Sequence, residues 1–250
     1  MRPRSEPVEK VFFETHYARA DNGARPVPAR LDAFVEDLLE LLEPLEGQCV
    51  LDLGCGEGEL SVALARRGAR VVSVDLARAG LALARRRAGA SEATLTAVCA
   101  SVHRLPFPDA SFDRVAGSRV LHHLELAPAA EEVRRVLAPG GRAAFSENFY
   151  TNPILFLCRE FLAGRFGIPR FGTPTERPLS GWSLGVLSRH FSVVRLSYPS
   201  FLFFHLLDRQ IFGCRHRGLN RLMIELDRLV HSRLPFLRPF SYRANIVLDP

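Results

Sequence analysis

Lysine is nearly absent from this 250-residue chain: Lys10 is the only one, so the formal net charge of +6 comes from arginine. The arginines form short runs such as 85–87 and 134–135, without the interleaved aromatic side chains that a nucleic-acid platform needs. A solvated helix face is the preferred interpretation of these runs, and a nucleic-acid or anionic-lipid patch is the alternative. A nucleic-acid partner is therefore not expected.

Closely spaced cysteines and long apolar runs are also missing. The five cysteines are odd in number and widely spaced, with no CxxC pair and no Cys/His grouping at zinc spacing, so reduced thiols and no metal site are expected. No apolar run reaches the ~18 residues that a membrane-spanning helix needs. The first seven residues are charged and proline-rich, unlike a secretory signal, and a cytoplasmic location is therefore expected.

Strand-like and helix-like patterns alternate along the chain. Strands are predicted at the short apolar runs 48–53, 69–74, 93–100, 113–118, 142–147, 191–197 and 244–248. Helices are predicted at the periodic segments 31–42, 59–67, 77–88, 128–137, 153–162, 182–190 and 219–229. The predicted helix 77–88 is expected to end at Gly89. The predicted helix 128–137 is expected to end before Pro139-Gly140-Gly141. Such alternation requires an α/β fold with a mostly parallel sheet covered on both faces.

A glycine turn follows the first predicted strand. Residues 52–58 read DLGCGEG, a D-x-G-x-G-x-G pattern that leaves a buried strand and enters a helix. Glycines allow positive φ and remove β-carbons, so a ligand can lie directly on the backbone beside the helix N-terminus. The dinucleotide fingerprint instead has G-x-G-x-x-G spacing, so a nicotinamide-dependent oxidoreductase is not favoured.

Two acidic residues flank this turn in the predicted sheet. Asp52 stands two residues before the first glycine, where a carboxylate repels a pyrophosphate but suits a cationic ligand with an amino group. Asp75 ends the second strand, where an acid is placed to accept ribose hydroxyls. The turn therefore predicts a site for a nucleoside that carries an amino acid, such as S-adenosylmethionine.

Several segments, in order, resemble the class I S-adenosylmethionine-dependent methyltransferases. The resemblance rests on 50–60 (VLDLGCGEGEL), 71–75 (VVSVD), 105–115 (LPFPDASFDRV), 120–124 (VLHHL) and 131–142 (EEVRRVLAPGGR). It points to the branch that includes ubiquinone and menaquinone methyltransferases and many natural-product enzymes. The implied fold is a Rossmann-like, seven-stranded, mostly parallel sheet sandwiched by helices, with a C-terminal apolar insertion or lid.

The resemblance also implies a single domain over 1–250 and a set of cofactor-binding residues. An N-terminal lid and first helix are expected at 1–47, the cofactor-binding core at 48–148, and substrate-side insertions with the last strands at 149–250. The implied S-adenosyl-L-methionine contacts are Asp52, Gly54, Cys55 and Gly56 for the amino acid end, Asp75 and Leu76 for the ribose, Ser101 and Val102 for the adenine, and Ser118 near the sulfonium. Ser101 departs from the family, which commonly has an acid there, so a weaker adenine contact is expected.

Methyl transfer needs a general base only if the acceptor must lose a proton. His122 and His123 follow the fourth strand, near the expected position of the transferred methyl, and either is a candidate base or a residue that shapes the pocket. Glu147, Asn148 and Tyr150 are candidate site residues, or else a helix cap or salt bridge. His16 and Tyr17 belong either to a lid or to an ordinary surface segment.

The most apolar segment, 201–207 (FLFFHLL), has three interpretations: a substrate cover, plain core packing, or a peripheral membrane contact flanked by arginines. The substrate cover is preferred and predicts an apolar small-molecule acceptor, methylated on oxygen, nitrogen or carbon. The alternative function is a non-catalytic S-adenosylmethionine-binding protein with a degenerate site, which the Ser101 departure favours. Methylation of nucleic acid or protein is not favoured, and the sequence carries no indication of the oligomeric state.

Overall fold

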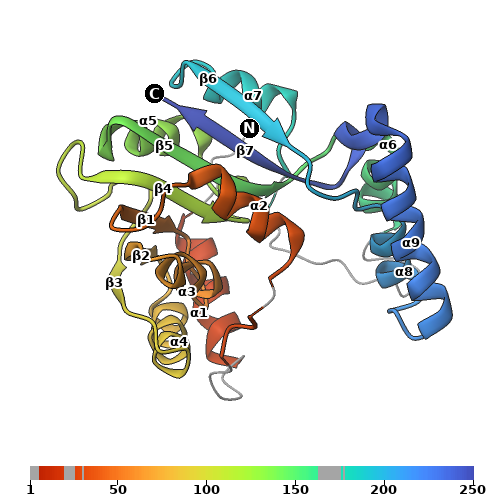
Figure 1. The fold of residues 1–250 in the computed structure, drawn as a ribbon, viewed down its shortest axis with the longest axis horizontal. Coiled ribbons are helices and arrows are strands. Elements are labelled where there is room, and N and C mark those ends of the chain that lie inside the picture. The colour runs from red at the N-terminus through yellow and green to blue at the C-terminus, as the bar shows by residue number, and fades with distance from the viewer. Residues whose placement is uncertain (1–5, 20–25, 30, 163–175, 177) are drawn as a thin grey trace.

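The computed structural model describes residues 6–19, 26–29, 31–162, 176 and 178–250. Seven strands form one sheet in the order β3-β2-β1-β4-β5-β7-β6, in which only β7 runs antiparallel to its neighbours (Figure 1). The strands are β1 (Cys49–Leu53), β2 (Arg70–Asp75), β3 (Leu95–Cys99), β4 (Phe112–Ser118), β5 (Leu137–Asn148), β6 (Val193–Ser197) and β7 (Arg243–Asp249). The predicted seven-stranded, mostly parallel α/β sheet is confirmed.

Helices cover both faces of this sheet. In chain order they are α1 (Glu6–Arg19), α2 (Ala33–Leu42), α3 (Glu59–Arg66), α4 (Arg78–Ala90), α5 (Leu126–Val136), α6 (Pro153–Leu157), α7 (Gly181–Leu187), α8 (Phe204–Ile211) and α9 (Arg217–Arg233). Three short turns, η1 (Leu121–His123), η2 (Cys158–Leu162) and η3 (Pro235–Phe240), complete the described elements. Asp32 begins α2 because its Oδ1 accepts hydrogen bonds from the N–H groups of Phe34 and Val35.

The hydrophobic core is split by the sheet, because successive side chains of a strand point to opposite faces. On one face, Val50 of β1 packs with α2 and α3 around Leu38, Leu42 and Leu64. On the other face, Leu51 and Leu53 pack with α5 and α7. The even-numbered residues of β1 therefore face α2 and α3. Asp52, near the C-terminal end of the strand, lies on this face.

Several elements differ from the sequence prediction, including α8, for which no helix was predicted. The helix α1 was not predicted at all, because residues 6–19 show no clear apolar stripe. The helix α4 continues through Gly89 to Ala90 instead of closing at Gly89. Strand β5 begins at Leu137, so Pro139-Gly140-Gly141 lies inside the strand; Gly140 takes φ +75° and the β4–β5 register shifts there. A strand can absorb this sequence through an irregularity that glycine permits.

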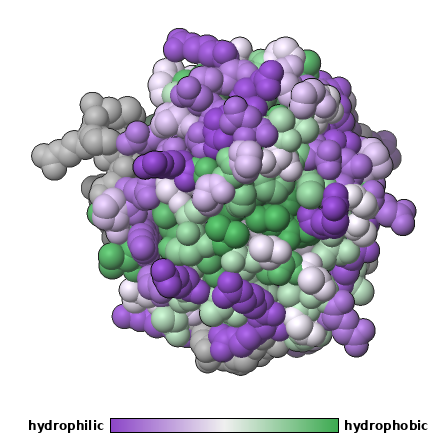
Figure 2. All heavy atoms as spheres, turned by 90° about the vertical axis from the view of Figure 1, so that its left-hand side faces the viewer, coloured by the Kyte–Doolittle hydropathy of each residue, from purple (hydrophilic) through white to green (hydrophobic). Residues whose placement is uncertain are grey.

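The last third of the chain leaves the sheet before returning to it. Helices α8 and α9 pack against each other beside the sheet and precede β7 (Figure 1). None of the helices in the described ranges has both the length and the hydrophobicity needed to span a bilayer. On the side where β3 is the edge strand, hydrophobic side chains gather at the centre of the face and hydrophilic ones surround them (Figure 2).

Candidate functional site

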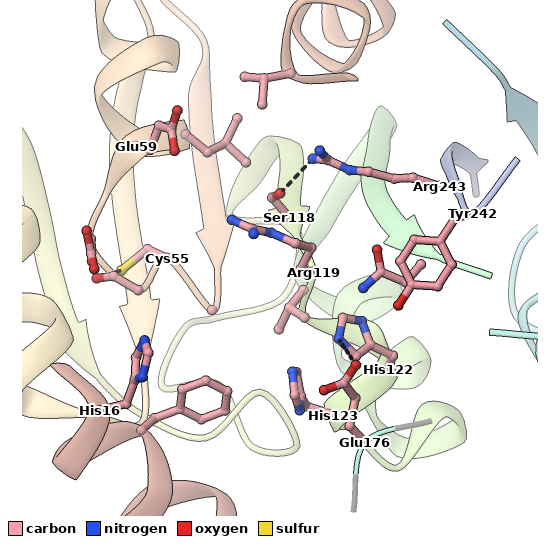
Figure 3. A pocket seen from close by; sticks show the side chains of 18 of the residues that line it. His16, Cys55, Glu59, Ser118, Arg119, His122, His123, Glu176, Tyr242 and Arg243 are labelled. Carbon is pink, nitrogen blue, oxygen red and sulfur yellow. Dashed lines mark hydrogen bonds and ion pairs between the residues drawn. The ribbon is translucent and has the colours of Figure 1, made fainter. Parts of the chain in front are cut away.

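A pocket of about 690 Å³ opens at the C-terminal ends of β1, β2 and β4. Strands β2 and β4 lie on opposite sides of β1, so the strand order reverses at this point. Open α/β sheets bind ligands at such a reversal. Helix α1 and helix α8 also contribute lining residues, so elements from both ends of the chain enclose the pocket. Figure 3 shows His16 and Cys55 on one side, and His122, Tyr242 and Glu176 on the other.

The glycine turn forms the floor beneath one end of this pocket. Gly54 and Gly56 have φ values of +62° and +51°, which L side chains rarely adopt. A β-carbon on Gly56 would lie 2.6 Å from the hydroxyl oxygen of Tyr17, so only glycine lets α1 approach the turn this closely. Gly58 then caps α3, whose N-terminus points toward the pocket end of β1.

Asp52 is buried at the end of β1 with one oxygen satisfied and one not. Its Oδ2 accepts a hydrogen bond of 2.5 Å from Ser61 of α3, while Oδ1 is buried without a hydrogen-bond partner and the residue lines the pocket. Burial raises the pKa of Asp52 to about 7, against the opposing effect of the Ser61 hydrogen bond. A cationic amino group would satisfy Oδ1 and favour the ionised form, so this residue fits the amino acid end of S-adenosylmethionine.

Asp75 ends β2 with both carboxylate oxygens anchored. Its Oδ2 accepts from the N–H of Gly56 and its Oδ1 from the N–H of Ala77, both at 2.8 Å. Burial raises the pKa of Asp75 despite these two hydrogen bonds. Each oxygen keeps a second lone pair, so the carboxylate is held in one orientation and can still accept ribose hydroxyls.

Ser101 is held by a carboxylate that comes from a distant part of the sequence. Its hydroxyl donates to Oε2 of Glu6 in α1 at 2.9 Å, and the same oxygen lies 3.2 Å from Nδ1 of His103. Ser101 is absent from the pocket lining, whereas Glu6, Val102 and His103 belong to it. A carboxylate, that of Glu6, therefore lies beside Ser101, which sequence order alone could not reveal.

Helix α1 covers the pocket through its aromatic side chains. The ring of Phe13 lies edge-on to His123 with centroids 5.1 Å apart, and stacks on Tyr17 at 5.8 Å. Burial and the nearby charge of Asp75 raise the pKa of Tyr17, so its hydroxyl stays protonated. His16 and Tyr17 both line the pocket, and the lid role of the N-terminal segment stays a prediction.

Glu147 organises the turn that follows β4. Its Oε1 accepts from the N–H groups of Val120 and Leu121 at 2.8 Å, and its Oε2 lies 2.5 Å from Nδ1 of His122. Burial opposes ionisation, but the positive charge and hydrogen bond of His122, together with the two N–H donors, hold the pKa of Glu147 below its usual value. An ionised Glu147 accepts the proton of Nδ1, so that in the neutral imidazole the lone pair lies on Nε2.

Ser118 meets a buried arginine from the last strand. Its hydroxyl oxygen lies 3.4 Å from Nη2 of Arg243, whose Nε donates to Ser146 and whose Nη1 lies 3.1 Å from Oδ2 of Asp32. Burial lowers the pKa of Arg243, and the charge of Asp32 counteracts this. This network joins β4, β5 and β7 where Ser118 and Arg243 line the pocket.

Most sequence-predicted site residues come together in this pocket. Those that line it are Asp52, Gly54, Cys55, Gly56, Asp75, Leu76, Val102, Ser118, His122, His123 and Asn148. Glu147 lies behind His122, and Tyr150 packs edge-on against Phe156 instead of lining the pocket. In the apolar segment 201–207, Leu202, His205, Leu206 and Leu207 line the pocket.

Comparison with known proteins gives the same assignment for this region. Residues 51–145 match a family model described as "Methyltransferase domain". The chain is 40% identical over 119 residues to demethylmenaquinone methyltransferase of Clavibacter sepedonicus, covering 47% of this chain and 48% of that protein. It is 44% identical over 114 residues to malonyl-[acyl-carrier protein] O-methyltransferase of Halorhodospira halophila, covering 44% and 38%.

Among solved structures, the fold is similar to geranyl diphosphate C-methyltransferase from Streptomyces coelicolor A3(2), with a TM-score of 0.62 over 99% of each chain. The sequences are 18% identical, so this likeness concerns the fold alone. The chain spans about half the length of the curated relatives it matches. This chain therefore contains, at residues 51–145, a methyltransferase domain whose glycine turn and strand-end acids lie in one pocket.

Proposed function

We propose that this protein transfers the methyl group of S-adenosylmethionine to a small, apolar acceptor. The observation that carries the proposal is the pairing of a glycine turn with the buried, unpartnered Oδ1 of Asp52 in a pocket of about 690 Å³. That volume falls within the range of sites for drug-sized molecules, so it accommodates the cofactor together with part of an acceptor. The cofactor supplies a methyl group activated by a sulfonium.

The apolar character of the acceptor follows from the side of the pocket opposite the glycine turn. Its wall includes Leu155 after β5 and Leu202, Leu206, Leu207 and Ile211 from the segment before and within α8, and the same helix adds His205, Arg209 and Gln210. Leu206 is 8% exposed and Ile211 is 55% exposed, so this wall runs from the interior to the surface. A cover of this kind favours a hydrocarbon-bearing acceptor; contact with a membrane surface is the alternative role for its exposed end.

Two tasks remain for the protein once both reactants are bound. The first is to hold the attacking atom in line with the methyl–sulfur bond, which the pocket lined by α1 and α8 can do. The second is to remove a proton if the attacking atom is a hydroxyl or an amine. His122 is our candidate for this second task, because Glu147 orients its ring; His123 is its neighbour in the same turn.

The proposal is tested first by calorimetric titration of the purified protein with S-adenosylmethionine, S-adenosylhomocysteine and NADH. We expect binding of the first two and none of NADH. A methyl-transfer assay then compares prenylated quinols, phenols and fatty acids with polar catechols and amines of similar reactivity. Equal turnover of polar and apolar acceptors would overturn the apolar assignment, and failure to bind either cofactor form would overturn the function.

Asp75→Ala is expected to weaken S-adenosylmethionine binding by about 1–3 kcal/mol, because charge-assisted hydrogen bonds to the ribose are lost. The matched control is Asp113→Ala, at the opposite end of the sheet, where the carboxylate accepts from the N–H of Cys49. Binding is measured by calorimetry, and circular dichroism checks that both variants fold. An unchanged dissociation constant in folded Asp75→Ala protein would show that the ribose is held elsewhere.

Glu6→Gln is expected to weaken cofactor binding by about 1 kcal/mol, because we infer that Glu6 also accepts from the adenine amino group. The effect is modest because the Glu6 side chain is 40% exposed. The discriminating measurement compares S-adenosylhomocysteine with S-inosylhomocysteine, which lacks the amino group. Wild-type protein should prefer the adenosyl ligand, and Glu6→Gln should reduce that preference; an undiminished preference contradicts the assignment.

A further inference from the structure

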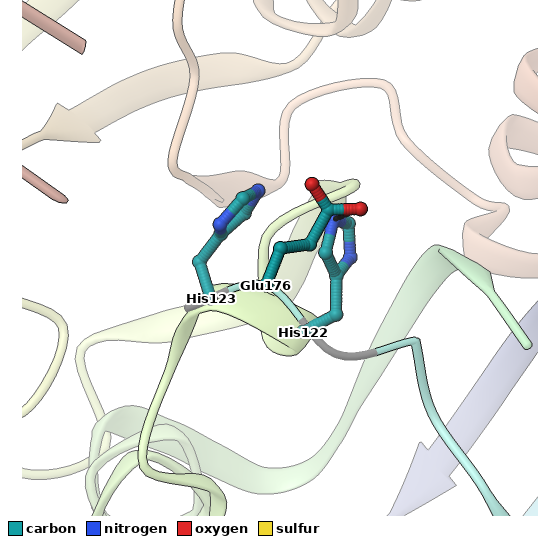
Figure 4. Close-up of side chains that lie close together, drawn as sticks. All are labelled: His122, His123 and Glu176. Carbon is teal, nitrogen blue, oxygen red and sulfur yellow. Dashed lines mark ion pairs between the residues drawn. The ribbon is translucent and has the colours of Figure 1, made fainter. Parts of the chain in front are cut away.

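Two imidazoles and a carboxylate meet beside the acceptor end of the pocket. Donor atoms of His122, His123 and Glu176 all lie within 4.8 Å of one another, and Nε2 of His122 is 3.7 Å from Oε1 of Glu176 (Figure 4). Two ligands bound to one ion at about 2.1 Å can be separated by at most about 4.2 Å, so small side-chain movements bring all three into bonding range. The three side chains are between 3% and 14% exposed, which shields them from competing water.

The surroundings of His122 resemble the support that metal-binding imidazoles receive. A histidine that binds a metal usually donates its other ring N–H to a carboxylate, which fixes the tautomer and raises the basicity of the ligand nitrogen. Glu147 provides this carboxylate at Nδ1 of His122, and Nε2 on the far side faces Glu176. A second carboxylate, Glu9 of α1, lies 3.3 Å from Nδ1 of His123.

We propose that His122, His123 and Glu176 bind a divalent first-row transition-metal ion. Two imidazole nitrogens with one carboxylate suit zinc, iron, cobalt or manganese, whereas calcium and magnesium prefer oxygen ligands. The carboxylates of Glu9, Glu147 and Glu176 supply the negative charge that a divalent cation needs in this buried location. Sequence spacing could not indicate this site, because Glu176 follows the two histidines only after β5 and α6.

Three protein ligands leave at least one coordination position open, and all three residues line the pocket. An oxygen of the acceptor can occupy that position, so the ion would orient the acceptor beside the cofactor. This consequence rests on the proposed methyl transfer, whereas binding of the ion itself does not. The two proposals can therefore fail separately.

The test is titration of the full, chelator-treated protein with Co²⁺, followed by visible absorption and calorimetry. We expect one equivalent bound per chain with d–d absorption bands, and displacement by Zn²⁺. Glu176→Gln and His123→Asn should each weaken Co²⁺ binding at least about tenfold, the effect typical of changes in and around a metal site. Glu147→Gln, which removes no proposed ligand, should weaken it by about 10–100-fold through His122.

A second cluster serves as the control for location. Among the described residues, His205, Asp208 and Cys214 also bring donor atoms within 4.8 Å of one another. Cys214→Ser should leave the Co²⁺ affinity unchanged, and no thiolate-to-cobalt charge-transfer band should appear. Loss of binding in Cys214→Ser, or unchanged binding in folded Glu176→Gln and His123→Asn proteins, overturns the proposal.

S-adenosylmethionine binding is measured on the same protein samples. Absence of Co²⁺ and Zn²⁺ binding while the cofactor still binds would overturn the metal site and leave the methyltransferase function standing. Metal binding without cofactor binding would support the metal site and overturn the methyltransferase function. Thermal unfolding of each variant identifies any loss of Co²⁺ binding that comes from misfolding. If the ligand variants Glu176→Gln and His123→Asn do not fold, the Co²⁺ affinity of Glu147→Gln decides whether the metal site exists.

Discussion

Asp52→Asn is expected to weaken S-adenosylmethionine binding at least about thirtyfold while making the free protein more stable. The asparagine can still accept the hydrogen bond from Ser61, but it cannot form a charge-assisted pair with the cofactor's amino group. Loss of one partner from a buried, hydrogen-bonded charge pair costs about 2–5 kcal/mol. Calorimetric titration of the wild type and variant measures this loss.

The stability effect has the opposite sign because burial raises the pKa of Asp52 from 3.8 to about 7. A raised carboxyl pKa contributes stability that is fully present below the unfolded value and is lost as the pH rises through the folded value. At pH 8 the wild type therefore carries a buried charge without a partner, and Asp52→Asn should unfold with a free energy about 1–3 kcal/mol higher. The difference should shrink as the pH falls from 8 to 5.

The pH dependence of cofactor affinity is a second measure of the ionisation of Asp52. Only the ionised form of Asp52 attracts an ammonium group, so wild-type affinity should fall by more than about tenfold between pH 7.5 and pH 5.5. Asp52→Asn should bind weakly at both values with little change between them. A wild-type affinity that is independent of pH, or an asparagine variant that binds as tightly as the wild type, would show that the amino group lies elsewhere.

His122→Asn is expected to lower kcat by about 10²–10⁴ for an acceptor that must lose a proton, which is the usual contribution of a positioned acid or base. The dissociation constant for S-adenosylmethionine should change little, because Asp52 and Asp75, the acids that we propose bind the cofactor, are untouched. The assay uses whichever acceptor of the panel described above is methylated fastest. The split between kcat and cofactor affinity separates a chemical role from a role in shaping the cofactor site.

A second substitution at Glu147 separates the effect of His122→Asn on stability from its effect on kcat. Removing the imidazole leaves a buried carboxylate without its charged partner, so His122→Asn should also lower the melting temperature. The double variant His122→Asn, Glu147→Gln should recover part of that stability but none of the activity. Restored activity in the double variant would show that His122 acts only through folding, and near-normal kcat in His122→Asn would remove it from the chemistry.

The ion proposed at His122, His123 and Glu176 changes how a loss of kcat is explained. If the ion is bound, His122 contributes as a ligand and activity should depend on added metal. If His122 acts as a base by itself, chelation should leave activity unchanged and the kcat loss in His122→Asn should persist. Repeating the assay after chelator treatment therefore distinguishes the two roles.

Local patterns gave reliable predictions where a short segment carries its own signal. The glycine turn and the acids Asp52 and Asp75 lie within 24 residues of one another in sequence and were placed correctly in one pocket. The helix α1 and the long β5 were missed for a common reason. Each depends on neighbours from elsewhere in the chain: α1 packs on α4, and β5 accommodates Pro139-Gly140-Gly141 by pairing with β4.

The sequence by itself determined the α/β class, the strand-turn-helix at 49–66 and the placing of Asp52, the glycine turn and Asp75 in one pocket. Backbone conformation there follows from glycine, strand ends and hydrophobic period. Only the tertiary structure decided which further carboxylates lie in or beside the pocket. Glu6 reaches Ser101, Glu147 orients His122, and Glu176 approaches both histidines across long stretches of chain. Such pairings are made by packing between elements, and no spacing along the chain encodes them.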